Sequence, residues 1–341
     1  MVQIMKRILL LQNESLMSIL ISLNRLKMTL PAYLKFYKED RLHQKIDQAR
    51  RMLESCSLCP RACGVNRLKG EQGFCKTGAE GYISSFGPHF GEESPLVGAM
   101  GSGTIFFSSC NLGCLFCQND SISHQMEGRA VSGDELASIM LSLQKRGCHN
   151  LNLVTPTHQL PAILQALELA ARRGLDLPVV WNCGGYESLA AIALLEGIVD
   201  IYMPDFKFWN EAASINYCRA PGYPEAARGA IAEMHRQTGP LQMNDRGIAV
   251  KGLLIRHLVM PGNLAGTEKI LEWIAREISP DTYVNVMSQY HPCFRAGEYP
   301  ELSRRITQAE YRQALSYARG AGLKRLDQDL SPGRRPRFPG Q

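Results

Sequence analysis

From residue 103 onward, the apolar positions of the chain follow a repeating pattern. Short apolar runs, of the length of buried strands, alternate with stretches in which apolar residues recur at helical spacing. The runs that predict strands are TIFFSS (104–109), LNLVTP (151–156), PVVWNC (178–183), DIYMPDF (200–206), GLLIRHLVM (252–260) and YVNVMSQ (283–289). A strand followed by a helix, repeated in this way, is typical of a parallel sheet with helical crossovers.

The helical stretches between these runs have recognisable ends. Ser132 and Glu135 form the pattern of a capping box, and so do Thr307 and Glu310 before the last helix. Pro161 suits the first turn of another helix, because the N–H groups of the first turn make no hydrogen bond within the helix and proline's missing N–H is therefore no loss there. These signals support the helices that the spacing of apolar residues predicts.

Six such units are fewer than the eight of a closed barrel. They are compatible with an open barrel or with a doubly wound sheet, and both place active residues at the carboxyl ends of the strands. We expect an α/β fold, a partial (β/α)6 barrel of the TIM type, over residues 101–326.

The remaining segments flank this predicted barrel. Residues 1–32 look like a disordered or non-native extension, in which Met28 is a candidate for the true start. Residues 33–100 are expected to hold a helix (33–55), a small cysteine-rich module and an ordered loop over the Gly/Pro-rich stretch 84–103. Residues 327–341 predict a basic disordered tail.

Composition and charge exclude some classes of protein. The 341 residues are 45% hydrophobic and 21% charged, which is a globular composition, and the net charge of +6 lies largely near the chain ends. Nucleic-acid binding is therefore unlikely, since it usually needs a denser basic patch. Asn13, Glu14 and Ser15 interrupt the apolar run near the start, which is too short and polar for a membrane span or a secretory signal.

The chain contains 11 cysteines, of which seven lie in two compact groups. Without a secretory signal we expect a reducing, cytoplasmic compartment, where clustered cysteines are metal ligands or catalytic groups more often than disulfides. The other four cysteines are scattered; these are Cys148, Cys183, Cys218 and Cys293. Cys183 and Cys293 lie at predicted strand ends and could reach the cavity, but we expect both to be small hydrophobic residues without a role.

Three cysteines, Cys110, Cys114 and Cys117, follow the first predicted barrel strand in SSCNLGCLFCQN. Thiolates favour iron–sulfur clusters, zinc or copper(I). A 4Fe–4S cluster held by three thiolates keeps one iron that can bind an outside molecule. The alternative is a partial zinc site that a distant residue completes.

Four further cysteines, Cys56, Cys59, Cys63 and Cys75, make a closed ligand set. A zinc ion would stabilise a segment that lacks a core of its own, whereas an auxiliary 4Fe–4S cluster would relay electrons or bind substrate. Both assignments stay open, and a set of disulfides is disfavoured in a reducing compartment.

The motif Cys-x3-Cys-x2-Cys, with Phe116 before the last cysteine and a place after the first strand of a βα array, resembles the radical S-adenosylmethionine (SAM) superfamily. CQN resembles the activating enzymes of glycyl-radical proteins, such as pyruvate formate-lyase activating enzyme. A less understood iron–sulfur homologue branch of that enzyme is similar in further motifs over residues 56–325; these are NLVTPTH, GYESL, VDIYMPDFKF, IRHLVMPG and VNVMSQYHP.

The resemblance implies the chemistry of that superfamily. A 4Fe–4S cluster binds SAM at its open iron and reduces it, and the resulting 5′-deoxyadenosyl radical abstracts a hydrogen atom from a substrate. A reductant such as flavodoxin or ferredoxin is implied as a partner. The substrate would be a glycine in a partner protein, a peptide or a small molecule.

Some roles are implied where the motifs match. Phe116 would pack near the adenine of SAM, and Asn182 would lie near the ribose. Activating enzymes hold the SAM amino group with Gly-Gly-Glu at the end of the second strand. VTPTH stands there in this chain, so Thr155, Thr157 and His158 are the polar candidates in its place. His158 as a packed helix-entry residue is the alternative.

Further candidates follow the later strands. Asp205 and Lys207 match the Asp-x-Lys of activating enzymes, in which the lysine would meet the SAM carboxylate, and a plain surface ion pair is the alternative. His291, in QYHP, matches another SAM contact of that family. Arg256 and His257 lie in one predicted strand, so strand alternation sends them to opposite faces.

The sequence therefore predicts a cytoplasmic radical SAM oxidoreductase with no membrane span. Two rival hypotheses remain. One is an iron–sulfur electron-transfer protein without SAM chemistry, and the other is a zinc-containing module that binds nucleic acid.

Overall fold

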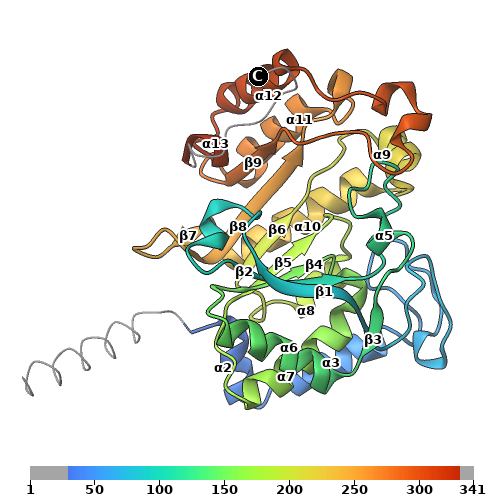
Figure 1. Ribbon diagram of the computed structural model, residues 1–341, viewed down its shortest axis with the longest axis vertical. Helices are drawn as coiled ribbons and strands as arrows, with labels where there is room; N and C mark the ends of the chain where they lie inside the picture. Colours follow the sequence, from blue (N-terminus) through green and yellow to red (C-terminus); the bar gives the residue numbers. More distant parts are fainter. Residues whose placement is uncertain (1–29, 331–341) are drawn as a thin grey trace, which may run out of the picture. The chain divides into compact units, whose positions relative to one another are not determined.

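The computed structural model describes residues 30–330, which form a mixed α/β structure around one mostly parallel sheet (Figure 1). The strand order is β10 (Arg325–Leu326), β9 (Tyr283–Met287), β8 (Ala249–Leu258), β6 (Ile201–Pro204), β5 (Val179–Cys183), β4 (Leu151–Val154), β2 (Ser102–Phe107), β1 (Gly81–His89) and β3 (Arg129–Val131). The short β7 (Gln242–Met243) pairs antiparallel with β8. The order ends at β10 and β3, so the sheet is not closed.

All neighbours from β2 to β10 pair in parallel, and they follow one another in chain order, with β3 and β7 standing outside the series. Each of the six predicted strands is present, with bounds that differ by a few residues. The predicted α/β class is therefore confirmed. The shared hydrophobicity of these runs reflects burial on both faces, as in β5, where all residues are buried.

β1 lies in the stretch that was predicted to be a loop, so that prediction was wrong. It pairs antiparallel with β2 over Ile83 to His89. Gly87 and Pro88 lie within it, and such residues are depleted from strands. Phe86 is 41% exposed, so the apolar alternation that marks a half-buried strand is weak here.

The capped helices are confirmed. The Ser132 hydroxyl accepts a hydrogen bond from the Glu135 N–H at the start of α6 (Gly133–Lys145). Thr307 and Glu310 form a complete capping box at α12 (Gln308–Gly320), and Pro161 lies in the first turn of α7 (Leu160–Arg172). The other helices are α2 (Ala32–Lys38), α3 (Leu42–Arg51), α4 (Ser94–Val97), α5 (Asp120–Ser123), α8 (Leu189–Leu194), α9 (Glu211–Cys218), α10 (Tyr223–Thr238), α11 (Thr267–Trp273) and α13 (Asp327–Leu330).

The helix predicted over 33–55 is two helices, α2 and α3. The chain turns between them at Asp40, whose φ of 54° is left-handed and cannot continue a helix. Within the segment predicted as a tail, residues 327–330 form the short α13. The predictions for 1–29 and 331–341 lie outside the described residues.

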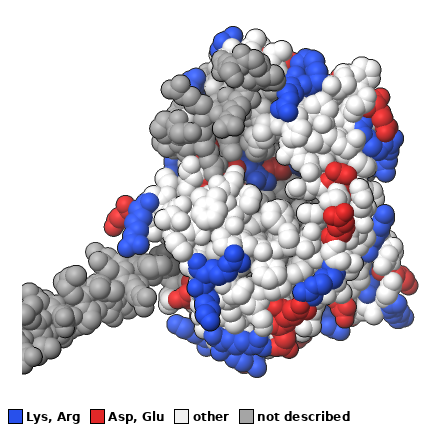
Figure 2. Space-filling model, in the orientation of Figure 1, with Lys and Arg blue, Asp and Glu red and all other residues white. Residues whose placement is uncertain are grey.

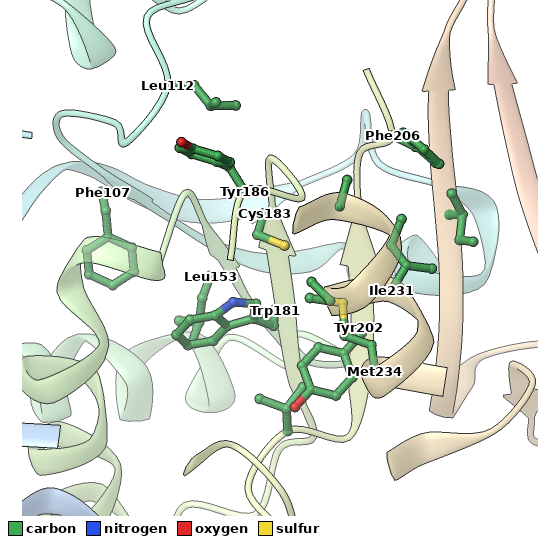
Figure 3. Close-up of a cluster of buried hydrophobic side chains, with 14 of the residues drawn as sticks. Phe107, Leu112, Leu153, Trp181, Cys183, Tyr186, Tyr202, Phe206, Ile231 and Met234 are labelled. Atoms are coloured by element: carbon green, nitrogen blue, oxygen red, sulfur yellow. The ribbon is translucent and has the colours of Figure 1, made fainter. Parts of the chain in front are cut away.

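Alternate residues of the central strands enter two different apolar clusters. Trp181 and Tyr202 are fully buried in the larger one, where they pack with Met234 of α10 (Figure 3). The residues that alternate with these along the strands point to the other face and form the smaller cluster. Its members are Val180, Ile201, Met203, Leu254 and Tyr283, with Leu96, Leu241 and Ala249. We call this second face of the strands the inner face.

Helices group on the outside of the strands, with α3, α6 and α7 together and α11 beside α12 (Figure 1). None of the helices between residues 30 and 330 combines the length and hydrophobicity that crossing a lipid bilayer requires.

We predict that Thr307→Ala lowers the free energy of unfolding by about 1 kcal/mol, because it removes the acceptor of the Glu310 N–H at the start of α12. Urea unfolding followed by circular dichroism measures the change. Ser316→Ala, at an exposed position inside the same helix, is the control and should change stability by less than about 0.5 kcal/mol. Equal effects of the two substitutions would contradict the assigned role of the cap.

Candidate functional site

Strand alternation brings three polar side chains together above the smaller apolar cluster. Asn182 lies two residues beyond Val180, and Arg256 lies two residues beyond Leu254, so both side chains share the inner face. Asp205 follows the end of β6 and forms a bridge with Arg256 of β8. The carboxyl ends of three parallel strands thus meet at one polar cluster.

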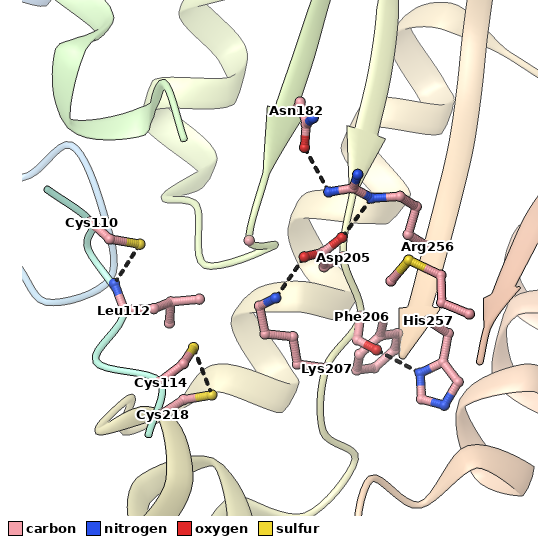
Figure 4. Close-up of polar contacts among 12 residues, drawn as sticks. Cys110, Leu112, Cys114, Asn182, Asp205, Phe206, Lys207, Cys218, Arg256 and His257 are labelled. Atoms are coloured by element: carbon pink, nitrogen blue, oxygen red, sulfur yellow. Dashed lines mark hydrogen bonds and ion pairs between the residues drawn. The ribbon is translucent and has the colours of Figure 1, made fainter. Parts of the chain in front are cut away.

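The cluster is a chain of largely buried charges and hydrogen bonds (Figure 4). Arg256 donates from Nε to Asp205 Oδ1 at 2.8 Å and from a terminal nitrogen to Asn182 Oδ1 at 2.7 Å. Lys207 Nζ donates to Asp205 Oδ2 at 2.6 Å. We call Asn182, Asp205, Lys207 and Arg256 the polar chain.

Electrostatics keep the polar chain ionised. Burial by itself raises the pKa of Asp205, but Arg256 and Lys207 outweigh burial and hold that pKa below its usual range. Burial by itself lowers the pKa of Lys207, and the charge of Asp205 raises it well above its ordinary value. The side chains of Asp205 and Lys207 are 14% and 18% exposed, so this is not the solvated surface pair of the alternative interpretation.

The three-cysteine loop, residues 110–117, lies beyond the carboxyl end of β2 and is tied to the end of α9. The Gly113 N–H donates to the Cys218 carbonyl and the Leu115 N–H to the Tyr217 carbonyl, both at 2.8 Å. A Cβ added at Gly184, after β5, would lie 2.6 Å from Leu112 Cδ1. Glycine at position 184 therefore makes room for the three-cysteine loop.

The three thiols of this loop sit in a buried, mutually interacting environment. A hydrogen bond with Cys218, whose sulfur is 3.2 Å away, and burial raise the pKa of Cys114. Burial is the largest cause that raises the pKa values of Cys110 and Cys117, and the neighbouring Cys114 is the second. The charge of Lys207 opposes this rise of the pKa at all three thiols. A Cβ added at Gly184 would lie 3.7 Å from Lys207 Cε and 2.6 Å from Leu112 Cδ1, so the Lys207 side chain lies beside the loop.

The donor set of the loop fits a soft metal centre. It consists of three thiols on a short segment, and thiolates are the ligands that iron–sulfur clusters take. No group of three or more His, Cys, Asp or Glu side chains between residues 30 and 330 is arranged so that it could hold a metal ion. The fit therefore rests on the chemistry of the donors and on the seating of the loop.

The second cysteine group converges on one place. Cys56, Cys59, Cys63 and Cys75 all line a single small pocket, which we call the four-cysteine pocket. The four residues therefore face one space, and their role as a metal ligand set stays a prediction. His158 lines the same pocket.

The remaining candidates at the end of β4 are buried or strained. Thr155 has a left-handed φ of 58°. The Thr157 hydroxyl donates to Glu187 Oε1 at 2.5 Å. His158 Nε2 lies 2.8 Å from the Ser108 carbonyl, and burial lowers the pKa of this histidine to about 4. The structure brings His158 to the four-cysteine pocket and not to the polar chain.

Two aromatic candidates lie apart from the polar chain. The Phe116 ring is buried and packs edge-on to Phe208 at 5.9 Å between ring centres. His291 is half-buried, and its Nδ1 lies 3.1 Å from the Gln289 carbonyl. Arg256 and His257 do point to different surroundings, as strand alternation predicts. His257 is fully buried between the Phe206 carbonyl and Thr267.

Sequence reasoning missed four site residues. Cys218 was counted only as a scattered cysteine, although its sulfur lies 3.2 Å from that of Cys114. Glu187, in the quoted GYESL, is buried, and burial raises its pKa to about 7. Glu92 and Glu93 lie in the stretch taken as loop, and no local pattern indicates that Glu92 lies 3.8 Å from Arg256.

A cavity of about 480 Å³ opens beside Arg256 at the carboxyl ends of β8 and β9. Glu92, Glu93, Asn285 and Gln289 are among the residues that line it. Its volume is within the range of small-molecule sites. The visible face of the protein carries interspersed acidic and basic side chains and no continuous basic patch (Figure 2).

The chain is similar to a known protein over most of its length. No protein-family model matches the sequence. The "Uncharacterized protein MJ0674" of Methanocaldococcus jannaschii is 34% identical to this chain over 295 residues, which make up 84% of this chain and 80% of that protein.

We predict that Asp205→Ala lowers the free energy of unfolding at pH 7 by about 3 to 5 kcal/mol, because it leaves two buried cations without their shared partner. Because the pKa of Asp205 is lowered in the folded state, this stabilisation is present above the ordinary aspartate pKa of about 4 and is lost as the pH falls further. Urea unfolding of wild type and variant between pH 3 and 7 measures the difference.

The matched control is Asp47→Ala, at an exposed position of α3, which should change stability by less than about 0.5 kcal/mol. A difference between wild type and Asp205→Ala that grew below pH 4 would contradict the assigned charge state.

Proposed function

We propose that this chain, which belongs to the same family as MJ0674 of Methanocaldococcus jannaschii, is a radical SAM enzyme that acts in a reducing, cytoplasmic compartment. The three-cysteine loop would hold a 4Fe–4S cluster, and the polar chain would hold the polar end of SAM. The reaction class would be hydrogen abstraction from a substrate.

The strand order supports the finer fold assignment, a partial (β/α)6 barrel. A doubly wound sheet reverses its strand order at a switch point, where it binds ligands. Here the parallel strands from β2 to β10 follow one another in chain order without such a reversal. The inner face of the strands would then be the lumen, and the polar chain would lie at its carboxyl end, where barrel enzymes place their active residues.

The observation that carries the proposal is the placement of Lys207. A Cβ added at Gly184 would lie 2.6 Å from Leu112 Cδ1 of the three-cysteine loop and 3.7 Å from Lys207 Cε, so the Lys207 side chain lies beside the loop, and its ammonium is bonded to Asp205 of the polar chain. Within the described part of the chain, Asp205 is the only hydrogen-bond partner of this ammonium. An ammonium has three N–H donors, so Lys207 can bind a further anionic group next to the thiols.

The pairing of the two cations leaves Lys207 as the one that can take an anionic ligand group. Arg256 shares Asp205 with Lys207 and also lies 3.8 Å from Glu92, whereas among the described residues the only ion pair of Lys207 is with Asp205. Buried charges are stable when they are paired, and a ligand carboxylate would pair with the free donors of Lys207. The carboxylate of SAM is such a group, and Lys207 would orient it towards the three-cysteine loop.

When bound, the 4Fe–4S cluster supplies an electron for the reductive cleavage of SAM to a 5′-deoxyadenosyl radical. The chain's own residues have other tasks. Cys110, Cys114 and Cys117 provide the thiolates, and Asp205 keeps Lys207 in place. The apolar residues of the inner face keep water from the site, which protects a reactive radical from side reactions.

The cavity beside Arg256 is the proposed substrate side of the site. It adjoins the polar chain through Arg256 and has room for a small molecule or a segment of peptide. A glycine in a partner protein fits the resemblance to activating enzymes, and a low-potential donor such as flavodoxin or ferredoxin would supply the electron.

We predict that the anaerobically reconstituted protein, reduced with dithionite, produces 5′-deoxyadenosine from SAM and that SAM changes the paramagnetic resonance spectrum of its cluster. Lys207→Met should keep the iron but weaken SAM binding at least tenfold, which corresponds to about 1.4 kcal/mol, because the carboxylate partner is lost. Cys117→Ser should lose the cluster.

Lys145→Met, at an exposed position at the end of α6, is the matched control and should bind SAM as the wild type does. Wild-type protein that holds iron, yet shows neither a spectral change with SAM nor 5′-deoxyadenosine, would refute the proposal and favour an electron-transfer protein.

A further inference from the structure

The four-cysteine pocket is lined by soft ligands and has no acidic side chain in its wall. Besides the cysteines, its lining residues are Leu58, Arg61, Arg67, Gly73, Phe74, Asn111 and His158. A complete set of four thiolates around one space is the ligand set of a closed zinc or iron–sulfur site. The pocket lies outside the polar chain and is not used by the proposed SAM chemistry.

Local backbone structure holds the four cysteines around this space. The Cys56 N–H donates to the Val65 carbonyl at 3.0 Å, and the Gly64 N–H returns a bond to the Cys56 carbonyl at 3.1 Å. A Cβ added at Gly73 would lie 2.8 Å from Cys63 Sγ. Only glycine therefore lets the returning segment approach that sulfur, so the segment is fitted to the thiols.

A buried cation indicates that the pocket receives a negatively charged group. The Arg67 side chain is 2% exposed and donates to the carbonyls of Gly78 and His158. None of the ion pairs among residues 30–330 involves Arg67, and its other terminal nitrogen lies 3.9 Å from Cys56 Sγ. Since a buried guanidinium is costly without an anion, metal-bound thiolates would supply its counter-charge.

Two more polar groups are directed to the same place. The Thr77 hydroxyl lies 3.2 Å from Cys75 Sγ and accepts a hydrogen bond from Arg67, so it can donate to the sulfur. His158 Nδ1 is buried without a hydrogen-bond partner in the described residues. Hydrogen bonds to the sulfurs of a bound cluster tune its reduction potential.

The four-cysteine pocket and the three-cysteine loop share a wall. The Ser109 hydroxyl, next to Cys110, donates to the Cys75 carbonyl. Arg61 Nε donates to the carbonyl of Asn111 at 2.6 Å, and Asn111 also lines the pocket. A zinc ion that only stabilised the N-terminal segment would not need this contact, whereas electron transfer between two metal centres requires closeness.

We propose that Cys56, Cys59, Cys63 and Cys75 hold a second iron–sulfur cluster, which passes an electron across the Ser109–Cys75 contact to the cluster of the three-cysteine loop. This inference rests on the proposed function. Cys63 is exposed while Cys114 is buried, so the electron enters at the four-cysteine pocket. A low-potential donor protein gives one electron to the second cluster and is itself oxidised. The second cluster then passes this electron to the first cluster and returns to its oxidised state.

The test begins with the wild-type protein, reconstituted without oxygen. We expect about eight irons per chain, two 4Fe–4S clusters, and two paramagnetic signals after reduction, of which SAM perturbs one. One zinc and about four irons per chain would overturn the inference while leaving the proposed function intact. If SAM perturbs neither signal and no 5′-deoxyadenosine forms, the proposed function fails instead.

The variant Cys56→Ala/Cys59→Ala tests the relay. It should keep about four irons and one SAM-sensitive signal. With dithionite, which reaches the first cluster directly, 5′-deoxyadenosine should form within about twofold of the wild-type rate. With reduced flavodoxin or ferredoxin the rate should fall at least tenfold. Equal rates with the protein donor would overturn the relay.

Cys148→Ala is the matched control, because Cys148 is a buried cysteine that belongs to neither group. It should retain about eight irons per chain and should form 5′-deoxyadenosine at the wild-type rate both with dithionite and with the protein donor. If the double variant does not fold, as judged by circular dichroism, the wild-type metal count and the two signals still decide whether the second cluster is present.

Discussion

The carboxylate of Asp205, held between two buried cations, is the interaction on which the arrangement of the site depends. Through Arg256 it joins the ends of β6 and β8 and reaches Asn182 of β5. Through Lys207 it holds a positive charge beside the three-cysteine loop. Burial alone would favour neutral forms of these groups, and their mutual attraction keeps them charged. One side chain thus couples the strands to the cysteines.

The sequence predicted the parts of this arrangement that depend on local order. Apolar runs marked the strands because parallel strands are buried on both faces. Alternation along β8 predicted that Arg256 and His257 separate, and they do: Arg256 joins Asp205, and His257 packs against Phe206. The starts of α6 and α12 could be predicted from their capping-box patterns, because all residues of such a pattern lie within four positions of one another in the sequence.

Features that depend on contacts between distant segments could not be predicted. β1 contains Gly87 and Pro88, and its existence follows from pairing with β2 rather than from its own propensity. Cys218 lies 104 positions from Cys114, so its sulfur contact has no local signal. The shared wall between the two cysteine groups likewise depends on Ser109 meeting Cys75 across 34 positions.

The cations beside the two cysteine groups explain why the groups are suited to different tasks. Arg67 donates to backbone carbonyls and Thr77, its other terminal nitrogen faces Cys56 Sγ, and four thiols line the same space. Four thiols are a complete ligand set, as a centre that only stores and passes charge should have. The Lys207 ammonium is held by one bond and keeps donors for a ligand, beside a loop of three thiols. Completeness at the four-cysteine pocket and incompleteness at the three-cysteine loop therefore support different roles for two centres that share a wall.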